Sequence, residues 1–376
     1  MSRKRGKLGN LEPAAWVRPE LRALPSYDYV PVAGDHKLDQ NEVPWELPRW
    51  VKQEVARRLV ETDWARYPDF HAEGLRRELG RLHGWPWEGV LVGNGSNELL
   101  ALALEALAPV GGEVLGAEPC FGLYRMFVTR AGARPRFLPP RPDLRLPVAE
   151  LQAEIEADPR RPLLLASPNN PTGEALSPAE IEGLLDRLEA PLLLDNAYAE
   201  FCRHDYRPLL AGHPHLLLFR TFSKAWSLAG LRLGYLLAHP DLVRELIKVK
   251  LPYNLGHAGA IAGQLALGRA QPAARRRVAV ILGRRPQWAR GLAAAGLEVF
   301  PSEANFLLVR CPSAAEAKRV KQGLAARGVL VREVGGGASG GALAGCLRIS
   351  IGGGAALRAT RMALAEIQPA LVEAGR

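Results

Sequence analysis

Short, leucine-rich apolar runs in the middle of the chain constrain the fold more than any other feature of the sequence. Four of them are prominent: Leu163–Leu165, Leu192–Leu194, Leu216–Phe219 and Leu233–Leu237. Strands that are covered on both faces have this continuous apolar character, whereas a strand with one face in water alternates. Helical segments such as Pro178–Leu188 separate several of the runs. The sequence therefore predicts an α/β domain with a mainly parallel sheet, which binds its ligands beyond the carboxyl ends of the strands.

The hydrophobic pattern divides the chain into three parts. Residues 1–40 are rich in proline and aromatic residues with weak periodicity, and we interpret them as an extended arm. Residues 41–270 hold the predicted sheet. Residues 271–376 begin with a long helix rich in arginine and alanine and read as a smaller α+β domain, which the arm is expected to join. The further predicted elements are helices at Leu47–Leu59, Glu73–Leu82, Glu98–Leu107, Ala273–Ala295 and Ala314–Arg327, and strands at Val90–Val92, Asn305–Val309 and near Val329 and Leu347.

Composition excludes several classes of protein. The 376 residues are 48% hydrophobic and 23% charged, which is typical of a soluble globular chain. No stretch approaches the roughly 18 apolar residues of a membrane helix, and the basic start lacks the apolar segment of a secretory signal. We therefore expect a cytoplasmic protein without membrane association. The four cysteines are far apart and lack metal-site spacing, so reduced thiols and no metal are expected.

The net charge of +10 raises the question of nucleic-acid binding. Four of these charges lie in the first seven residues, and the remainder are mostly arginines scattered over predicted helices, such as Arg275–Arg277. No aromatic residues interleave with a basic stripe. We therefore expect no nucleic-acid partner, and a basic surface suits anionic metabolites equally well.

Lys224 is one of only nine lysines, against forty arginines, and it directly follows a predicted strand. Burial between Phe222 and Trp226 would lower the pKa of its amine, and such a lysine can form an imine with a carbonyl. A lysine that reaches solvent from a strand end fits the same pattern. Arg232, in a segment with two glycines, suits either a phosphate clamp or a structural ion pair.

Three other polar groups also follow predicted strands. Asp195 ends one strand and could serve a ligand or cap the next segment. Ser167–Gly173 contains Asn-Pro-Thr-Gly, in which the asparagine offers a donor and an acceptor, although the segment could be a simple turn. Gly93–Asn97 lies between a strand and a helix, where the glycines and the helix N-terminus suit phosphate, with an N-cap as the alternative. It lacks the Walker and dinucleotide patterns.

In combination and in this order, these elements resemble the fold-type I, class I and II aminotransferases, and within them the histidinol-phosphate aminotransferase family. The resemblance runs from about residue 24 to 365. Its supporting stretches are Asp39–Glu42, Ala65–Asp69, Asp195–Phe201, Val331–Arg332 and Gly345–Arg348.

The resemblance implies pyridoxal 5'-phosphate as the cofactor. Lys224 would carry it as a Schiff base and then move the substrate α-proton. Asp195 would face the pyridine nitrogen, and Asn170 and Tyr198 would hydrogen-bond the phenolate oxygen. A tyrosine matching Tyr67 reaches the neighbouring subunit's cofactor phosphate in this family, which implies a homodimer with shared active sites. The residues implied to hold the phosphate are Ser96, Asn97, Ser223 and Arg232.

The substrate site follows from the same resemblance. Arg348 would meet the α-carboxylate of glutamate or the phosphate of histidinol phosphate, and Arg332 would be a second arginine for that phosphate. Asn41 and Tyr27 belong to the predicted pocket, with Tyr29 competing for the role of Tyr27.

Two positions depart from the family pattern. Phe121 takes the place of a tyrosine that stacks on the cofactor ring, so stacking is kept and a hydroxyl is lost. Asn196 replaces a glutamate, which removes a charge near the cofactor edge; the sequence gives no effect for this change.

The favoured activity is transamination between histidinol phosphate and 2-oxoglutarate in histidine biosynthesis. An aromatic or broad-specificity amino-acid aminotransferase and a threonine-phosphate decarboxylase share this scaffold and stay open as alternatives. A non-catalytic, cofactor-binding regulator is a remote alternative, because the segment of about forty residues before the fold is too short and too proline-rich for a helix-turn-helix domain.

Overall fold

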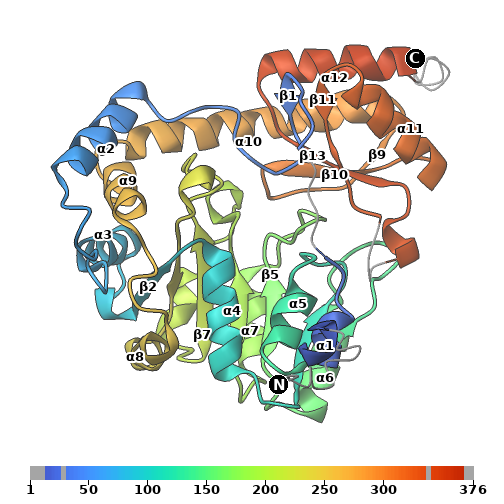
Figure 1. Ribbon diagram of the computed structural model, residues 1–376. Helices are drawn as coiled ribbons and strands as arrows, with labels where there is room; N and C mark the ends of the chain where they lie inside the picture. Colours follow the sequence, from blue (N-terminus) through green and yellow to red (C-terminus); the bar gives the residue numbers. More distant parts are fainter. Residues whose placement is uncertain (1–12, 27–30, 336–339, 368–376) are drawn as a thin grey trace, which may run out of the picture.

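The computed structural model describes residues 13–26, 31–335 and 340–367, and a seven-stranded sheet forms its centre (Figure 1). The strand order is β2-β8-β7-β6-β5-β3-β4. The two pairs that include β8 are antiparallel and the others are parallel, so the predicted α/β fold with a mainly parallel sheet is confirmed. The strands are β2 (Val90–Gly93), β3 (Glu113–Ala117), β4 (Arg134–Leu138), β5 (Leu163–Ala166), β6 (Leu192–Asp195), β7 (Leu216–Thr221) and β8 (Gly234–Leu237).

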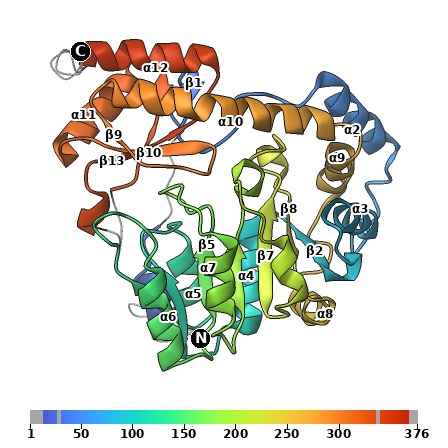
Figure 2. The same ribbon diagram turned by 180° about the vertical axis from the view of Figure 1, so that it is seen from behind.

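Helices cover both faces of this sheet, which explains the continuous leucine runs (Figures 1 and 2). In β6, Leu192 and Leu194 pack into one apolar cluster and Leu193 packs into another on the opposite face. The first cluster includes α3 (Glu73–His83), α6 (Val148–Ala157), α7 (Pro178–Leu185) and α9 (His257–Leu267). The second includes α4 (Ser96–Leu107), α5 (Tyr124–Arg130) and α8 (Pro240–Val249).

The long helix α10 (Gln271–Ala293) leads from the large sheet to a second, four-stranded antiparallel sheet of order β12-β13-β10-β9 (Figure 1). Trp288 of α10 is fully buried and donates a hydrogen bond from Nε1 to the Gly352 carbonyl at 3.3 Å, which ties the helix to the smaller unit. The elements here are β9 (Glu298–Val299), β10 (Phe306–Arg310), α11 (Ala314–Ala325), β12 (Arg332–Glu333), β13 (Cys346–Ser350) and α12 (Gly354–Ile367).

The N-terminal segment touches both units. Arg18, next to α1 (Pro19–Arg22), donates to the carbonyl of Arg130 in α5 at 2.9 Å. Further on, β1 (His36–Lys37) pairs in parallel with β11 (Val329–Leu330) beside the smaller sheet. The division of the chain at residues 40 and 270 stays a prediction. The remaining elements are α2 (Arg49–Glu61) and the 3-10 turns η1 (Pro13–Trp16), η2 (Trp87–Gly89), η3 (Ala199–Phe201), η4 (Arg207–Ala211), η5 (Ala229–Leu231) and η6 (Gly340–Leu343).

None of the helices within the described ranges combines the length and the apolar character that crossing a bilayer requires.

Candidate active site

The polar residues predicted from the sequence gather at one edge of the large sheet. Asp195 is the last residue of β6, while Asn170 and Lys224 follow the ends of β5 and β7. These three strands are neighbours and run in parallel, so the loops at their carboxyl ends meet.

Lys224 is partly buried, and its Nζ donates a hydrogen bond to the carbonyl oxygen of Gln40 at 2.9 Å. Burial, assisted by the positive charge of Arg348, lowers the pKa of the amine from 10.5 to about 8. A lysine of this kind is partly unprotonated near neutral pH and can therefore act as a nucleophile and as a base.

Asp195 is 8% exposed, and both of its carboxylate oxygens accept hydrogen bonds. The Tyr124 hydroxyl donates to Oδ2 at 2.8 Å, and the backbone N–H of Ala197 donates to Oδ1 at 3.1 Å. Burial raises the pKa of Asp195 to about 6, against the effect of these two bonds, which lower it. Sequence reasoning missed Tyr124. The only signal was its position three residues after Phe121, whose ring lies edge-on to it at 5.6 Å.

The glycine-rich turn and the lysine loop meet at the N-terminus of α4. Gly95 has a φ of +86°, and a Cβ at this position would lie 2.7 Å from Nη2 of Arg232, so the guanidinium lies directly over the turn. Nη1 of Arg232 also donates to Ser223 Oγ at 3.5 Å. Ser96 and Asn97 form the first turn of the helix, whose free N–H groups favour an anion. The structure thus brings together the four residues predicted to hold a phosphate.

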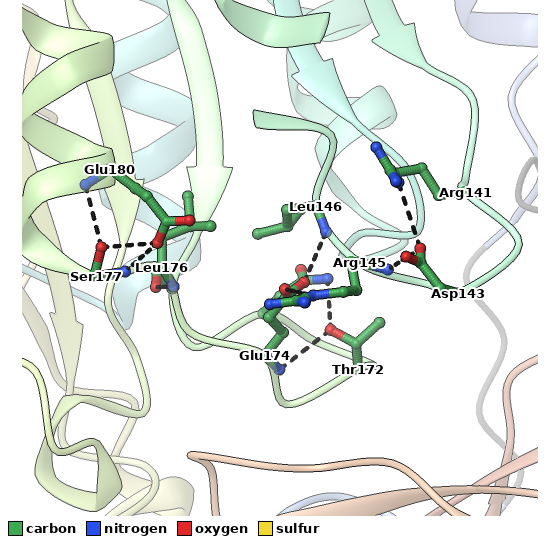
Figure 3. Close-up of polar contacts among 11 residues, drawn as sticks. Arg141, Asp143, Arg145, Leu146, Thr172, Glu174, Leu176, Ser177 and Glu180 are labelled. Atoms are coloured by element: carbon green, nitrogen blue, oxygen red, sulfur yellow. Dashed lines mark hydrogen bonds and ion pairs between the residues drawn. The ribbon is translucent and has the colours of Figure 1, made fainter. Parts of the chain in front are cut away.

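The Asn-Pro-Thr-Gly turn is held by a network of side chains (Figure 3). Thr172 Oγ1 accepts the N–H of Glu174 at 3.3 Å. The Glu174 carboxylate accepts the N–H of Leu146 at 2.7 Å and Nε of Arg145 at 3.2 Å. These contacts fix the turn on the segment before α6, so that Asn170 has a defined position at the sheet edge.

Residues that follow β1 cross the site. The backbone oxygen of Asp39 accepts a hydrogen bond from Nη2 of Arg348 at 2.7 Å, and the backbone oxygen of Gln40 is the acceptor for Nζ of Lys224. Asn41 is buried and donates from Nδ2 to the hydroxyl of Tyr198 at 2.9 Å, while its own N–H donates to Ser350 Oγ at 2.9 Å. Asn41 has a φ of +56°, which asparagine tolerates better than most residues. The N-terminal arm therefore joins the edge of the large sheet to the smaller sheet.

Arg332 and Arg348 stand directly opposite each other on the antiparallel strands β12 and β13. Side chains at opposed positions lie on the same face of a sheet, and two like charges there repel each other. Arg348 also donates from Nη1 to Asn170 Oδ1 at 2.7 Å, which connects this pair to the turn after β5. The pair forms a site of positive charge suited to an anion.

Other residues predicted from the sequence lie away from this cluster or outside the described part of the chain. Tyr67, between α2 and α3, is 77% exposed and stacks on Tyr253 with ring centroids 4.3 Å apart. Tyr27 and its competitor Tyr29 lie outside the described residues. The side chain of Asn196 faces away from the site: its Oδ1 accepts from Nε of Arg220 at 3.2 Å. This position, which departs from the family pattern, therefore lies beside Arg220, because successive residues at a strand end point to opposite faces.

Comparisons with known proteins agree with this geometry. Residues 33–363 match the family of class I and II aminotransferases. The histidinol-phosphate aminotransferase of Gloeobacter violaceus is 39% identical over 342 residues, which cover 90% of this chain and 93% of the relative. That of Deinococcus radiodurans is 34% identical, with coverage of 89% and 92%. The crystal structure of the Sinorhizobium meliloti histidinol-phosphate aminotransferase in complex with pyridoxal-5'-phosphate superposes with a TM-score of 0.85, at 24% identity and with coverage of 95% and 98%.

The chain therefore belongs to the class I and II aminotransferases, with their fold-type I architecture. Within that class it is a member of the histidinol-phosphate aminotransferase family, and the resemblance inferred from its motifs is confirmed.

Proposed function

We propose that the protein catalyses pyridoxal-phosphate-dependent transamination between histidinol phosphate and 2-oxoglutarate, which yields imidazole-acetol phosphate and glutamate. The observation that carries the choice of substrate is the pair of opposed arginines, Arg332 and Arg348. A phosphate dianion between two guanidinium groups would relieve their repulsion and accept several charge-assisted hydrogen bonds. The curated relatives with histidinol-phosphate activity in their names support the same substrate.

The residues present fit the cofactor. Asp195 is a buried carboxylate without an ion pair among the described residues, as expected of a group that awaits a cationic ring nitrogen. Gly95 has a positive φ, and a Cβ there would lie 2.7 Å from Nη2 of Arg232, so the glycine lets this guanidinium lie against the turn where a phosphate would bind. Ser96 and Ser223 supply hydroxyl donors beside it. Pyridoxal phosphate, when bound, supplies a ring that takes up the electron pair left after the α-proton departs.

The chain's own groups then have distinct tasks. Lys224 would hold the cofactor through an imine; once the substrate amine has displaced it, its free Nζ would carry the α-proton from the substrate to the cofactor carbon of the imine, for which a pKa near 8 is well suited. Asp195, held by Tyr124, keeps the ring nitrogen protonated. Tyr198 and Asn170 orient the ring oxygen. Arg348 exchanges its present acceptors, which include the amide oxygen of Asn170, for the substrate anion.

A coupled assay with purified protein tests the substrate. Arg332→Gln should raise KM for histidinol phosphate by roughly tenfold to a hundredfold and leave KM for glutamate nearly unchanged, because one charge-assisted bond to the phosphate is lost. Arg244→Gln, on the exposed side of α8, removes the same charge elsewhere and serves as the control. Turnover of phenylalanine or tyrosine without turnover of histidinol phosphate would instead identify an aromatic aminotransferase. Carbon dioxide released from threonine phosphate would identify a decarboxylase.

The assembly is the second part of the proposal. Tyr67 is largely exposed, its ring is held flat against Tyr253, and Leu251 nearby is 70% exposed, so this surface is suited to a second copy of the chain. In the homodimer Tyr67 would reach the cofactor phosphate of the partner subunit. Mixing Tyr67→Ala and Lys224→Ala chains should restore activity through hybrid dimers that carry one intact site. No recovery after subunit exchange would argue that each site is complete within one chain. A cytoplasmic location and the absence of nucleic-acid partners stay predictions.

A further inference from the structure

A second pocket lies on the face of the large sheet opposite α4. It is bounded by α3, α10 and the segment from η3 to η4, and has a volume of about 370 Å³. None of the residues assigned to the candidate active site lines it, although Ala225 and Trp226, just after the site lysine, form part of its wall. Its volume falls within the range of roughly 300–1,000 Å³ that small-molecule pockets have.

Arg220 of β7 lines this pocket and is 8% exposed. Its Nε and Nη2 both donate to a neutral acceptor, Asn196 Oδ1, at 3.2 and 3.1 Å, and its other hydrogen-bond neighbour is the neutral hydroxyl of Tyr235. Within the described part of the chain no carboxylate forms an ion pair with this guanidinium. A buried charge that meets only neutral acceptors is costly, and a mobile anion that enters the pocket would compensate it.

The other charged side chains of the pocket leave an excess of positive charge. The pocket is lined by four arginines and two carboxylates, which are Arg203, Arg207, Arg220, Arg275, Glu200 and Asp205. Asp205 is engaged by Arg207 at 2.6 Å, and Glu200 accepts Nε1 of Trp226 at 3.2 Å. Arg203 pairs with a carboxylate outside the pocket. Arg275 lies exposed on α10 and, in the described ranges, has no ion pair.

The imidazole of His83 lies beside two of these arginines and does not offset their positive charge. Burial, followed by the charges of Arg220 and Arg207, lowers the pKa of its imidazole to about 2, so it is neutral in this pocket. Its Nδ1 lies 3.4 Å from Nη1 of Arg207, which can only donate. Nε2 therefore carries the proton and donates to the Tyr235 hydroxyl at 2.9 Å. The imidazole adds no charge and can accept or donate no further bond to an anion, so recognition falls to the guanidinium groups.

We propose that this pocket binds the phosphate group of inorganic phosphate or of a small phosphorylated metabolite, with Arg220 at its base and Arg275 at its rim. The planar guanidinium of Arg220 matches two oxygens of a phosphate, and its present neutral acceptors, Asn196 Oδ1 and the Tyr235 hydroxyl, leave donor capacity for them. This site is separate from the catalytic one and does not depend on the substrate proposed above.

A crystal of the enzyme loaded with its cofactor, soaked in tungstate, locates bound oxyanions directly by anomalous scattering. The expected result is a tungstate peak beside Arg220. Calorimetric titration with inorganic phosphate then measures affinity, and the loss in Arg220→Gln should be roughly tenfold or more. Arg275→Gln, on an exposed helical surface, should weaken binding several-fold and keeps the test decisive if the buried variant does not fold. Arg244→Gln is the charge-matched control.

Tungstate found only between the two opposed arginines of the catalytic site would overturn the proposal, as would a phosphate affinity equal to the wild type in both pocket variants. Titration with a sugar phosphate beside inorganic phosphate separates the two sources of the anion. Tighter binding of the sugar phosphate, lost in Arg275→Gln, identifies a metabolite site. Equal binding identifies a site for inorganic phosphate.

Discussion

Replacing Lys224 by methionine should abolish transamination and, in the cofactor-free protein, stabilise the fold. A pKa lowered from 10.5 to about 8 means that the folded state disfavours the ammonium form by about 3 kcal/mol at neutral pH. Partial solvent access and the lost hydrogen bond to the Gln40 carbonyl reduce the net gain to about 1–3 kcal/mol. Methionine keeps a similar length and carries no charge.

The pH dependence identifies the cause. Between pH 8 and 10.5 the folded lysine has lost its proton while the unfolded lysine still holds one, so wild-type stability rises with pH in this interval. The advantage of Lys224→Met should therefore be full below pH 8 and shrink toward zero as pH approaches 10.5. Urea unfolding of the two cofactor-free proteins at pH 7, 8, 9 and 10 measures this difference. A variant that is no more stable at pH 7, or a difference that does not change with pH, would refute the assignment of Lys224 as a destabilised amine.

Two further predictions concern groups around the site, and a third concerns the start of helix α7. Tyr124→Phe removes a hydrogen bond that lowers the pKa of Asp195, so this pKa should rise from about 6 by about one unit or more in the cofactor-free protein. Carbon-13 NMR of the carboxyl group follows this change. Replacing another buried tyrosine, in Tyr206→Phe, should leave the pKa of Asp195 unchanged. Gly234→Ala places a Cβ 2.3 Å from the backbone nitrogen of Ser96, and equilibrium dialysis should record a cofactor affinity roughly tenfold weaker. The control is Gly283→Ala, where the Cβ meets open space. That variant should retain the cofactor and gain up to about 1 kcal/mol of helix stability. Ser177→Ala breaks the capping box at the start of α7 and should cost about 1 kcal/mol in urea unfolding without a change in kcat; an intact free energy of unfolding would contradict the role of the cap.

Most of the large sheet could be predicted from the sequence because its central strands are buried on both faces and therefore carry an unbroken apolar signal. The helix boundaries also agree closely: Glu73–Leu82 was expected and α3 spans Glu73–His83, while the long helix begins two residues earlier than expected. The weaker signals came from β4, which is partly exposed at the sheet edge, and from its neighbour β3, whose apolar residues are interrupted by Gly116 and preceded by Glu113. The two-residue strands β1 and β12 also gave weak signals. Such short pairings are selected by tertiary packing and leave no period to detect.

The candidate site was partly predictable because its residues follow strands whose ends must meet. The sequence could not indicate that Tyr124 supports Asp195, since a buried tyrosine on a helix is equally consistent with core packing. It also could not reveal that Asn196 serves the opposite side of the sheet. Sequence motifs do not show where backbone carbonyls point. The carbonyl acceptors of Asp39 and Gln40 are therefore identified only from the position of the arm in the structure.

The crossing of the site by the arm has a consequence for the order of assembly. Asn41 and Ser350 are bonded across 309 positions of sequence, and Arg348 holds the Asp39 carbonyl over the same separation. Contacts of such high contact order form late, because the entropy of closing the loop must first be overcome. During synthesis Asp39 and Asn41 can therefore form these contacts only after almost the whole chain has left the ribosome. A chain truncated before β13 lacks the strand that holds the arm in place. Binding of the cofactor in the geometry of the complete site would therefore show that synthesis of the chain has passed β13.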